Sequence, residues 1–232
     1  MRSAPGAPIV AIMKMNGRSE KQKSRSTGAL RTRRRSAASD VLLEAAEAVI
    51  AAKGYERATL QDIAKNAGCA AGTVYLYFKN KEILYNAMVT RHTTELAARC
   101  GSAFDGKHDA LGSHRLFLGE IVAYFNAHRA FFRIFYTAGP SGRAHLESNL
   151  HDDALGALEK SKAKALAAYK IGQRAGLIRS DVDAAELCAF VDAVLMCTLA
   201  RWSIDGVKLS EAEQVDLLWR LTTGGLVGEA RS

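Results

Sequence analysis

The most informative segment of this sequence is TLQDIAKNAGCAAGTVYLYF, residues 59–78. Thr59, with Asp62 three residues later, is a short-side-chain form of the capping box, which predicts that a helix begins here. Apolar residues then recur at helical spacing, and Gly68, which tolerates a positive φ, predicts the end of that helix. A second short helix is predicted over about 70–77. The segment therefore predicts two short helices joined by a tight turn.

This pair of helices has the features of a helix-turn-helix. Ala64 supplies the small side chain that is needed where the second helix crosses the first, and Gly68 supplies the turn. Four positions are expected to be buried between the helices: Ile63, Cys69, Val74 and Phe78. The face expected to meet DNA comprises Ala70, Ala71, Gly72, Thr73, Tyr75 and Tyr77. An ordinary helical hairpin with an aromatic cluster is the alternative, and the complete spacing favours the DNA-binding interpretation.

The same residues resemble the TetR family of bacterial repressors. The matching positions are Ala52-Lys-Gly-Tyr55, Thr59, Asp62-Ile-Ala64, Ala67-Gly68, Gly72-Thr-Val-Tyr75, Tyr77-Phe78 and Lys79-Asn-Lys-Glu-x-Leu84, within a segment of about 36–100. The resemblance implies an all-α fold whose N-terminal domain places its third helix in the major groove. It also implies a C-terminal helical domain that binds a small-molecule effector and pairs with a second copy. The chain is thus expected to be a homodimeric, ligand-responsive repressor of transcription.

Ten residues are candidates for contact with operator DNA: Thr59, Gln61, Ala70, Ala71, Gly72, Thr73, Tyr75, Tyr77, Lys79 and Lys81. The family resemblance implies contacts with the DNA backbone at four of them: Thr73, Tyr75, Tyr77 and Lys81. Hydroxyl groups and a lysine ammonium suit phosphate oxygens. Ala70, Ala71 and Gly72 offer a base no side-chain hydrogen bond, only apolar contact with a thymine methyl. Many relatives carry a polar residue near Ala70, so base reading stays open, with Gln61 and the Arg31–Arg35 cluster as further candidates.

Positive charge is concentrated at the N-terminus. The net charge is +8, and the first 38 residues hold ten Lys or Arg against one Glu. Residues 1–35 lack apolar periodicity and are predicted to be a disordered tail. Its Arg31–Arg35 end is suited to follow phosphates or enter a minor groove, although translation starting at Met13 or Met15 would remove its first residues. A non-specific architectural DNA-binding protein that relies on this tail is the alternative function.

The rest of the chain is expected to form two helical domains. Residues 36–100 are assigned to the helix-turn-helix domain with its connecting helix, and 101–232 to a regulatory, ligand-binding and dimerisation domain. Pro occurs three times and strand-like alternation is missing, which favours an all-α fold. Further helices are expected at about 109–127, 129–138, 146–175, 183–204 and 210–227. Two of them open with capping patterns, Asp183-x-x-Glu186 and Ser210-x-x-Glu213.

Several functional classes lack a sequence signature. No enzyme motif such as G-x-S-x-G, a P-loop or H-E-x-x-H is present, so neither catalysis nor a cofactor is expected. The four cysteines form no C-x-x-C and the six histidines no H-x3-H, so no disulfide or metal site is expected. Redox sensing through Cys188 and Cys197 is disfavoured, because two residues nine apart on one helix cannot bridge in place. No uninterrupted apolar run reaches the roughly 18–20 residues of a membrane span, so a cytoplasmic location is expected.

Large side chains gather in the C-terminal half and suggest a pocket for a hydrophobic or planar effector. The lining candidates are Phe117, Phe125, Phe132, Phe135, Tyr136, Tyr169, Met196 and Trp202. The polar candidates for orienting such a ligand are His128, Arg129, Arg133 and His145. For any single aromatic residue, a place in an ordinary helical core is the alternative.

The last two helices are expected to form the dimer surface. One apolar stripe comprises Ala184, Leu187, Cys188, Val191, Val194 and Leu195; the other comprises Val215, Leu218, Trp219, Leu221 and Leu226. A single short reading helix buries too little surface for tight specific binding, so two copies and an inverted-repeat operator are expected.

Overall fold

The computed structural model describes residues 35–137 and 152–227, and the regular structure in these ranges is entirely helical. The predicted all-α class is therefore confirmed. A first helix occupies residues 35–53 and is followed by α2 (Leu60–Asn66), α3 (Ala71–Tyr77) and α4 (Lys81–Ser102). The later helices are α5 (Ala110–Ala127), α6 (Arg129–Thr137), α8 (Asp152–Arg174), α9 (Ala184–Asp205) and α10 (Glu211–Leu226). The predicted N-terminal tail up to residue 34 and His145 lie outside the described residues.

Local sequence signals explain where several helices begin and end. Thr59 caps α2 and Ser210 caps α10, each in a complete capping box with the acidic residue three positions later. Asp183 is the N-cap of α9 as predicted, but it does not form the predicted capping box with Glu186, because its carboxylate accepts the amide N–H of Ala185. Gly68 has the positive φ, 68°, that was predicted for the turn after α2.

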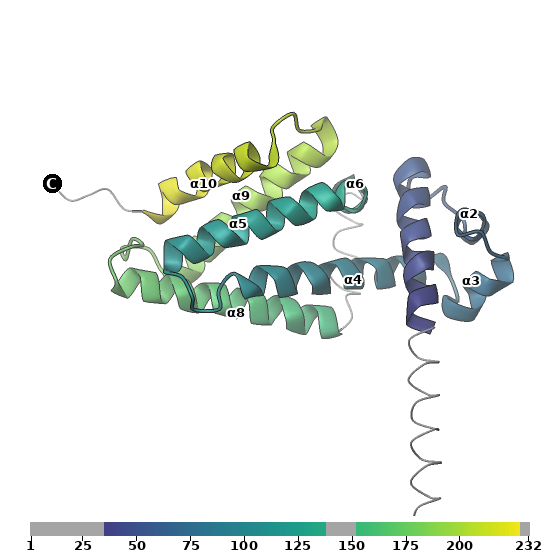
Figure 1. Ribbon diagram of the computed structural model, residues 1–232, viewed down its shortest axis with the longest axis horizontal. Helices are drawn as coiled ribbons and strands as arrows, with labels where there is room; N and C mark the ends of the chain where they lie inside the picture. The colour runs from purple at the N-terminus through teal and green to yellow at the C-terminus, as the bar shows by residue number, and fades with distance from the viewer. Residues whose placement is uncertain (1–34, 138–151, 228–232) are drawn as a thin grey trace, which may run out of the picture.

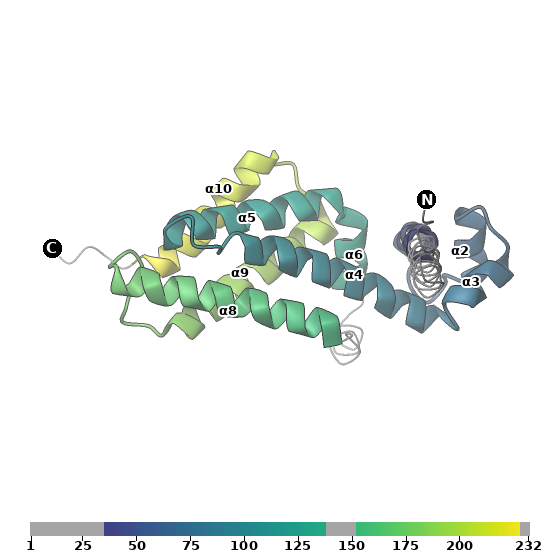
Figure 2. The same ribbon diagram turned by 60° about the horizontal axis from the view of Figure 1, so that its bottom comes forward.

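The helices form a small head and a larger body joined by α4 (Figure 1). The head consists of the helix over 35–53 with α2 and α3, and it lies at one end of the elongated molecule. From the head, α4 runs into the body, where it packs against α8 and α5. The remaining helices α6, α9 and α10 complete the body, and α2 and α3 lie on the side of the head away from it (Figure 2). The long helix α4 therefore connects the head to the body.

Apolar side chains from distant segments close the core of the head. Ile63 of α2, Val74 of α3 and Leu84 of α4 are fully buried against the helix over 35–53, from which Ala46 and Ile50 are also buried. Burying a side chain such as Ile or Leu contributes about 1.5–3 kcal/mol each. This packing, rather than any single hydrogen bond, fixes α3 on the surface of the head.

The predicted dimer stripe on α9 is wrong, because its largest side chains are used inside the protomer. Leu187, Val191 and Leu195 are each at most 4% exposed. The face of α9 left at the surface instead carries Phe190 and Met196, each 40% exposed. Apolar residues of α9 lie on every face of the helix, so their spacing does not identify which face is left exposed on the protomer. On α10 the predicted stripe is also mostly buried: Leu218 and Leu226 are inaccessible, Val215 and Trp219 are half-buried, and only Leu221 is exposed.

The apolar character of α9 exceeds what the protomer buries. Its mean hydropathy is 1.6 over an 18-residue window, enough by length and composition for a membrane span, and 33% of that window is buried. The expectation drawn from uninterrupted apolar runs missed this, because the helix is interrupted by Glu186, Asp192 and Arg201. In the body α9 packs against α6, α8 and α10. Its outer face remains available to an apolar partner.

Candidate nucleic-acid interface and effector region

The turn between α2 and α3 has the geometry that the sequence predicted. The amide of Cys69 donates to the carbonyl of Ala64 over 2.9 Å, and the amide of Thr73 donates to the carbonyl of Ala70 over 2.9 Å. Ala64 is 2% exposed, which leaves no room there for a larger side chain. The backbone therefore places α3 across α2, with Val74 facing inward.

The outer face of α3 is rich in large side chains. Tyr75 is 49% exposed, and Thr73 and Tyr77 are half-buried. Leu76 is 76% exposed and is not among the residues predicted from the sequence to contact DNA. Its position between Tyr75 and Tyr77, on the helix expected to enter the major groove, could have identified it as a candidate for DNA contact. An exposed leucine on such a helix offers apolar contact to a thymine methyl.

Thr59 and Lys81 are already engaged within the protein. The Thr59 hydroxyl accepts the amide N–H of Asp62 over 3.1 Å and lies 2.9 Å from its carboxylate, so it stabilises the start of α2. The Lys81 ammonium donates to the carbonyls of Tyr55 and Glu56, over 2.7 and 3.1 Å. This differs from the expected role of Lys81 as a mobile counter-charge for phosphate, because the ammonium holds the turn that precedes α2.

Other candidates on this face remain exposed. Gln61 lies on the first turn of α2, and Ala70, Gly72 and Lys79 flank or belong to α3; all four are exposed, and Ala71 is half-buried. The guanidinium of Arg35 lies 5.9 Å from the ring centre of Tyr77. The end of the basic cluster is therefore held beside the reading helix by a contact between a cation and an aromatic face.

The structure divides the candidate effector residues into two aromatic clusters. Phe125 contacts Phe132 and Trp202, with ring centres 5.3 and 5.8 Å apart, and Tyr136 stacks beside Phe132 at 6.2 Å. Met196 joins this first cluster, because its sulfur accepts a 3.5 Å hydrogen bond from Tyr136, and Phe135 packs on the same tyrosine.

The second cluster lies between α5, α8 and α10. Phe117 and Tyr169 both pack around Phe104 and His114. Tyr169 is 2% exposed and closely surrounded, as its contacts with these rings show. The eight lining candidates therefore do not surround one common space in the described residues. Of the polar candidates, Arg133 donates to the carbonyl of Ala51 over 2.6 Å and Arg129 to Asn126.

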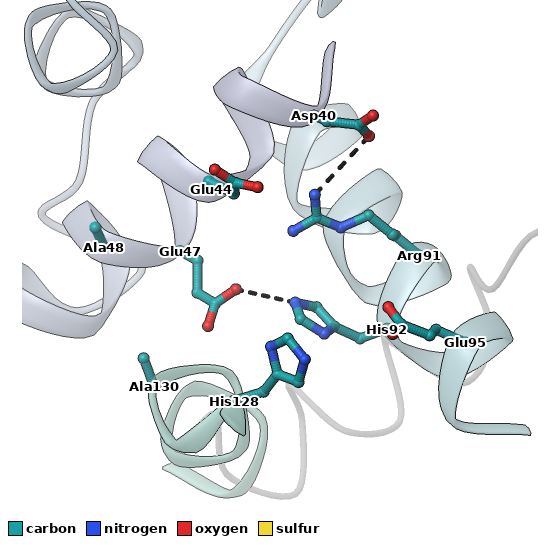
Figure 3. A pocket seen from close by; sticks show the side chains of 9 residues that line it. All are labelled: Asp40, Glu44, Glu47, Ala48, Arg91, His92, Glu95, His128 and Ala130. Atoms are coloured by element: carbon teal, nitrogen blue, oxygen red, sulfur yellow. Dashed lines mark hydrogen bonds and ion pairs between the residues drawn. The ribbon is translucent and has the colours of Figure 1, made fainter. Parts of the chain in front are cut away.

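A hollow of about 610 Å³ lies where the head meets the body (Figure 3). The residues lining it are Asp40, Glu44, Glu47, Ala48, Arg91, His92, Glu95, His128 and Ala130. Four of them are acidic and one is an arginine, and Arg91 lies 3.9 Å from the carboxylate of Asp40. The hollow therefore favours a cation over an anion.

A titratable cluster occupies the floor of this hollow. The Nε2 atom of His92 lies 2.9 Å from the Glu47 carboxylate, and its Nδ1 atom lies 2.8 Å from the Tyr124 hydroxyl. His128 packs edge-on against His92, with ring centres 4.9 Å apart. The other carboxylate oxygen of Glu47 accepts the amide N–H of Phe131 over 3.1 Å.

The surroundings set the charge states of this cluster. Burial by itself raises the pKa of Glu47, but the hydrogen bond with His92 and nearby positive charge bring it below its usual value. Burial and the proximity of His92 lower the pKa of His128. Glu47 is thus held as a carboxylate and His128 as a neutral imidazole at neutral pH.

A helix-turn-helix head joined to a helical body is the arrangement typical of ligand-responsive DNA-binding regulators. Residues 42–88 match the family model described as "Bacterial regulatory proteins, tetR family". The match is confined to the helix-turn-helix region, and the arrangement of all the described helices is similar to that of solved regulators whose structures are compared below.

Curated proteins are similar to this chain over part of their length. The "Fatty acid metabolism regulator protein" of Bacillus subtilis is 56% identical over 41 residues, which are 18% of this chain and 21% of that protein. The uncharacterized HTH-type transcriptional regulator YhgD, also of Bacillus subtilis, is 32% identical over 40% of this chain and 42% of its own length. These alignments therefore span between a fifth and two fifths of the curated relatives' lengths.

Solved structures show a likeness over most of the chain. The fatty acid degradation regulator FadR from Bacillus halodurans has a TM-score of 0.70 and 21% identity, covering 81% of this chain and 95% of that one. FadR from Bacillus subtilis, solved in complex with stearoyl-CoA, has a TM-score of 0.68 and 20% identity. The likeness covers 80% of this chain and 97% of that one. At these identities the likeness establishes the fold.

Proposed function

We propose that this protein is a dimeric, sequence-specific DNA-binding regulator of transcription that releases an inverted-repeat operator when a small hydrophobic molecule binds its body. The observation that carries the proposal is the outer face of α3. A short helix that exposes Tyr75 and Leu76 while Val74 anchors it from behind is built to enter a major groove. The family match of residues 42–88 supports the same conclusion.

The exposed face of α9 and α10 supports the proposed dimer. Phe190, Met196 and Ile204 on α9 are 40%, 40% and 64% exposed, and Leu221 on α10 is 44% exposed. An apolar surface of this kind is stabilised when a second copy covers it. A Cβ atom at Gly225 would overlap the Phe190 ring, so this glycine lets α10 approach α9 closely. Two heads on such a dimer would read half-sites about one helical turn apart, roughly 34–36 Å.

The operator test is selection of bound sequences from a random DNA pool by the untagged protein at about physiological salt. We expect enrichment of an inverted repeat that Tyr75→Ala no longer binds. Ile171→Ala is the matched control, because Ile171 is a large side chain on α8 of the body and is 57% exposed, against 49% for Tyr75. Binding without sequence preference that disappears when residues 1–34 are deleted would instead support the architectural alternative.

The effector test uses the selected operator. Stearoyl-CoA is the first probe, because FadR of Bacillus subtilis was solved with it, and free coenzyme A is the matched control without the acyl chain. We expect the acyl compound to lower operator affinity and coenzyme A to leave it unchanged. A coupling of about 1–3 kcal/mol, or roughly 5–150-fold in affinity, is typical of allosteric regulators. If stearoyl-CoA left the operator affinity unchanged, long-chain acyl-CoA compounds would be excluded as effectors, and other hydrophobic molecules would be screened.

A further inference from the structure

Three side chains that are far apart in the sequence meet at the junction of head and body. Glu47 comes from the helix over 35–53, His92 from α4, and His128 caps the C-terminus of α5. One ligand atom from each of these residues lies within 4.8 Å of the other two. The sequence spacing did not indicate this cluster, because no pair of these residues occurs in a local metal-binding pattern.

From this geometry we propose that Glu47, His92 and His128 form a binding site for a divalent transition-metal ion that ties the reading head to the body. Two imidazole nitrogens and one carboxylate oxygen are a ligand set that suits Zn²⁺, with a fourth position left for water. The hollow beside the cluster provides space at that position (Figure 3).

A metal ion can take the place of the proton between Glu47 and His92. In the absence of an ion, the 2.9 Å contact is a hydrogen bond in which the Nε2–H of His92 donates to the carboxylate, and loss of that proton leaves a nitrogen and an oxygen lone pair directed at the same point. Ligand atoms in a tetrahedral zinc site lie about 3.3–3.5 Å apart, given bond lengths of about 2.0–2.1 Å. Opening this contact slightly and turning His128 inward would therefore complete the site.

Residues behind the cluster are placed to orient its ligands. The Tyr124 hydroxyl is 2.8 Å from His92 Nδ1 and 3.4 Å from the His92 carbonyl, to which it donates. Because the Tyr124 hydroxyl donates its proton to the His92 carbonyl, the Tyr124 oxygen can accept a proton from Nδ1 of His92. In that tautomer the Nε2 lone pair of His92 is available to a metal. The amide N–H of Phe131 donates to the second carboxylate oxygen of Glu47 and so fixes the orientation of that carboxylate. Such outer hydrogen bonds are characteristic of metal-binding histidines and carboxylates.

The charge and burial around the cluster favour a cation. Asp40, Glu44 and Glu95 line the same hollow as Glu47, and Arg91 is the basic side chain among the lining residues. His92 is 1% exposed and stacks on Phe131 with ring centres 4.0 Å apart, so its position is set by packing before any ion binds. A preorganised ligand binds with less loss of conformational entropy.

Because its ligands come from both parts of the molecule, an ion at this site would favour one orientation of the head. It would then change operator affinity by the same factor by which DNA changes metal affinity. This consequence rests on the proposed function, whereas the site itself does not.

The site is tested on the untagged, chelator-treated full chain without DNA. We expect isothermal titration with Zn²⁺ to show one equivalent per chain, and Co²⁺ to give the absorption bands of a low-symmetry site with nitrogen and oxygen ligands. Glu47→Gln and His128→Asn should each weaken binding by more than about tenfold. His108→Asn, which changes an exposed histidine of the loop before α5, is the matched control and should bind as the wild type does.

Folding and coupling are measured separately. Zn²⁺ should raise the melting temperature of the wild type and of His108→Asn, but not of Glu47→Gln or His128→Asn, whose circular dichroism verifies their fold. Zinc binding of equal strength in all four proteins, or none in the wild type, would overturn the site. Operator affinity that is identical with and without Zn²⁺ would overturn the coupling, and failure to select any operator would count against the proposed function alone.

Discussion

The Tyr169 hydroxyl and Nδ1 of His114 lie 2.8 Å apart in the interior of the body, where they join α8 to α5. The other ring nitrogen of His114 lies 2.7 Å from the hydroxyl of Thr222, which links α10 to the same histidine. Since the Thr222 hydroxyl donates to the Leu218 carbonyl, its oxygen accepts the Nε2 proton and Nδ1 accepts from Tyr169. A neutral imidazole satisfies every partner in this network, and a second proton would have no acceptor.

Stability should therefore fall as the pH falls through the range set by His114. Burial lowers the pKa of His114 from 6.5 to about 4, so between these values the unfolded chain binds a proton that the folded chain does not. The contribution is fully present above pH 6.5 and is lost as the pH approaches 4, by about 3 kcal/mol in all. Urea unfolding at pH 7.0 and 4.5 measures it. His114→Gln removes the titrating group, and an equally large pH-dependent loss in that variant would contradict the assignment.

Gly172→Ala should destabilise the body. A Cβ atom at Gly172 would lie 2.6 Å from Cβ of Ala110 and 2.9 Å from Cδ1 of Ile178, and neither neighbour can move freely in the packed interior. We expect a loss of about 1–3 kcal/mol in the free energy of unfolding from overpacking. Gly119→Ala, on α5 with open space at the Cβ position, is the control and should be neutral or stabilising by up to about 1 kcal/mol. Equal effects in thermal or urea melts would show that the close approach of Gly172 is unimportant.

Lys79→Ala should reduce the salt dependence of DNA binding. Lys79 is exposed directly after α3, where its ammonium can neutralise one phosphate. Each phosphate contact contributes about 0.9 to the slope of log affinity against log salt concentration, so the slope should fall by about 1. Lys170→Ala removes the same charge from the exposed face of α8 and should leave the slope unchanged. Fluorescence anisotropy over a salt series distinguishes them, and identical slopes would place Lys79 away from the DNA.

Ala193→Glu should convert the proposed dimer into monomers. Ala193 lies on the exposed face of α9 between Phe190 and Met196, so a carboxylate there would be buried without a partner when two copies pair. Ala167→Glu is the matched control, because it places the same charge at an exposed alanine of α8. Sedimentation equilibrium should show a monomer for the first variant and a dimer for the second. A dimer in both would locate the interface elsewhere.

Local sequence patterns predicted the head of this protein well. The capping box at Thr59, the positive φ at Gly68 and the burial of Ile63 and Val74 all appear in the structure as expected. These features depend on contacts between residues a few positions apart, so they can be read along the chain. The spacing also predicted the helix-turn-helix, which lies within the segment that matches the family model.

Contacts between distant helices decided the rest. The free face of α9 was predicted wrongly, because apolar residues lie all around that helix and only packing against α6, α8 and α10 determines which of them are covered. Lys81 was expected at DNA phosphate, yet its ammonium binds backbone carbonyls 25 and 26 residues earlier. Glu47 and His92 are 45 positions apart and meet because the first helix crosses α4. The sequence alone thus determined the all-α class and the helix-turn-helix, because both depend on short-range patterns. Tertiary packing depends on the shapes of many side chains together, and it decided which polar groups remain available for function.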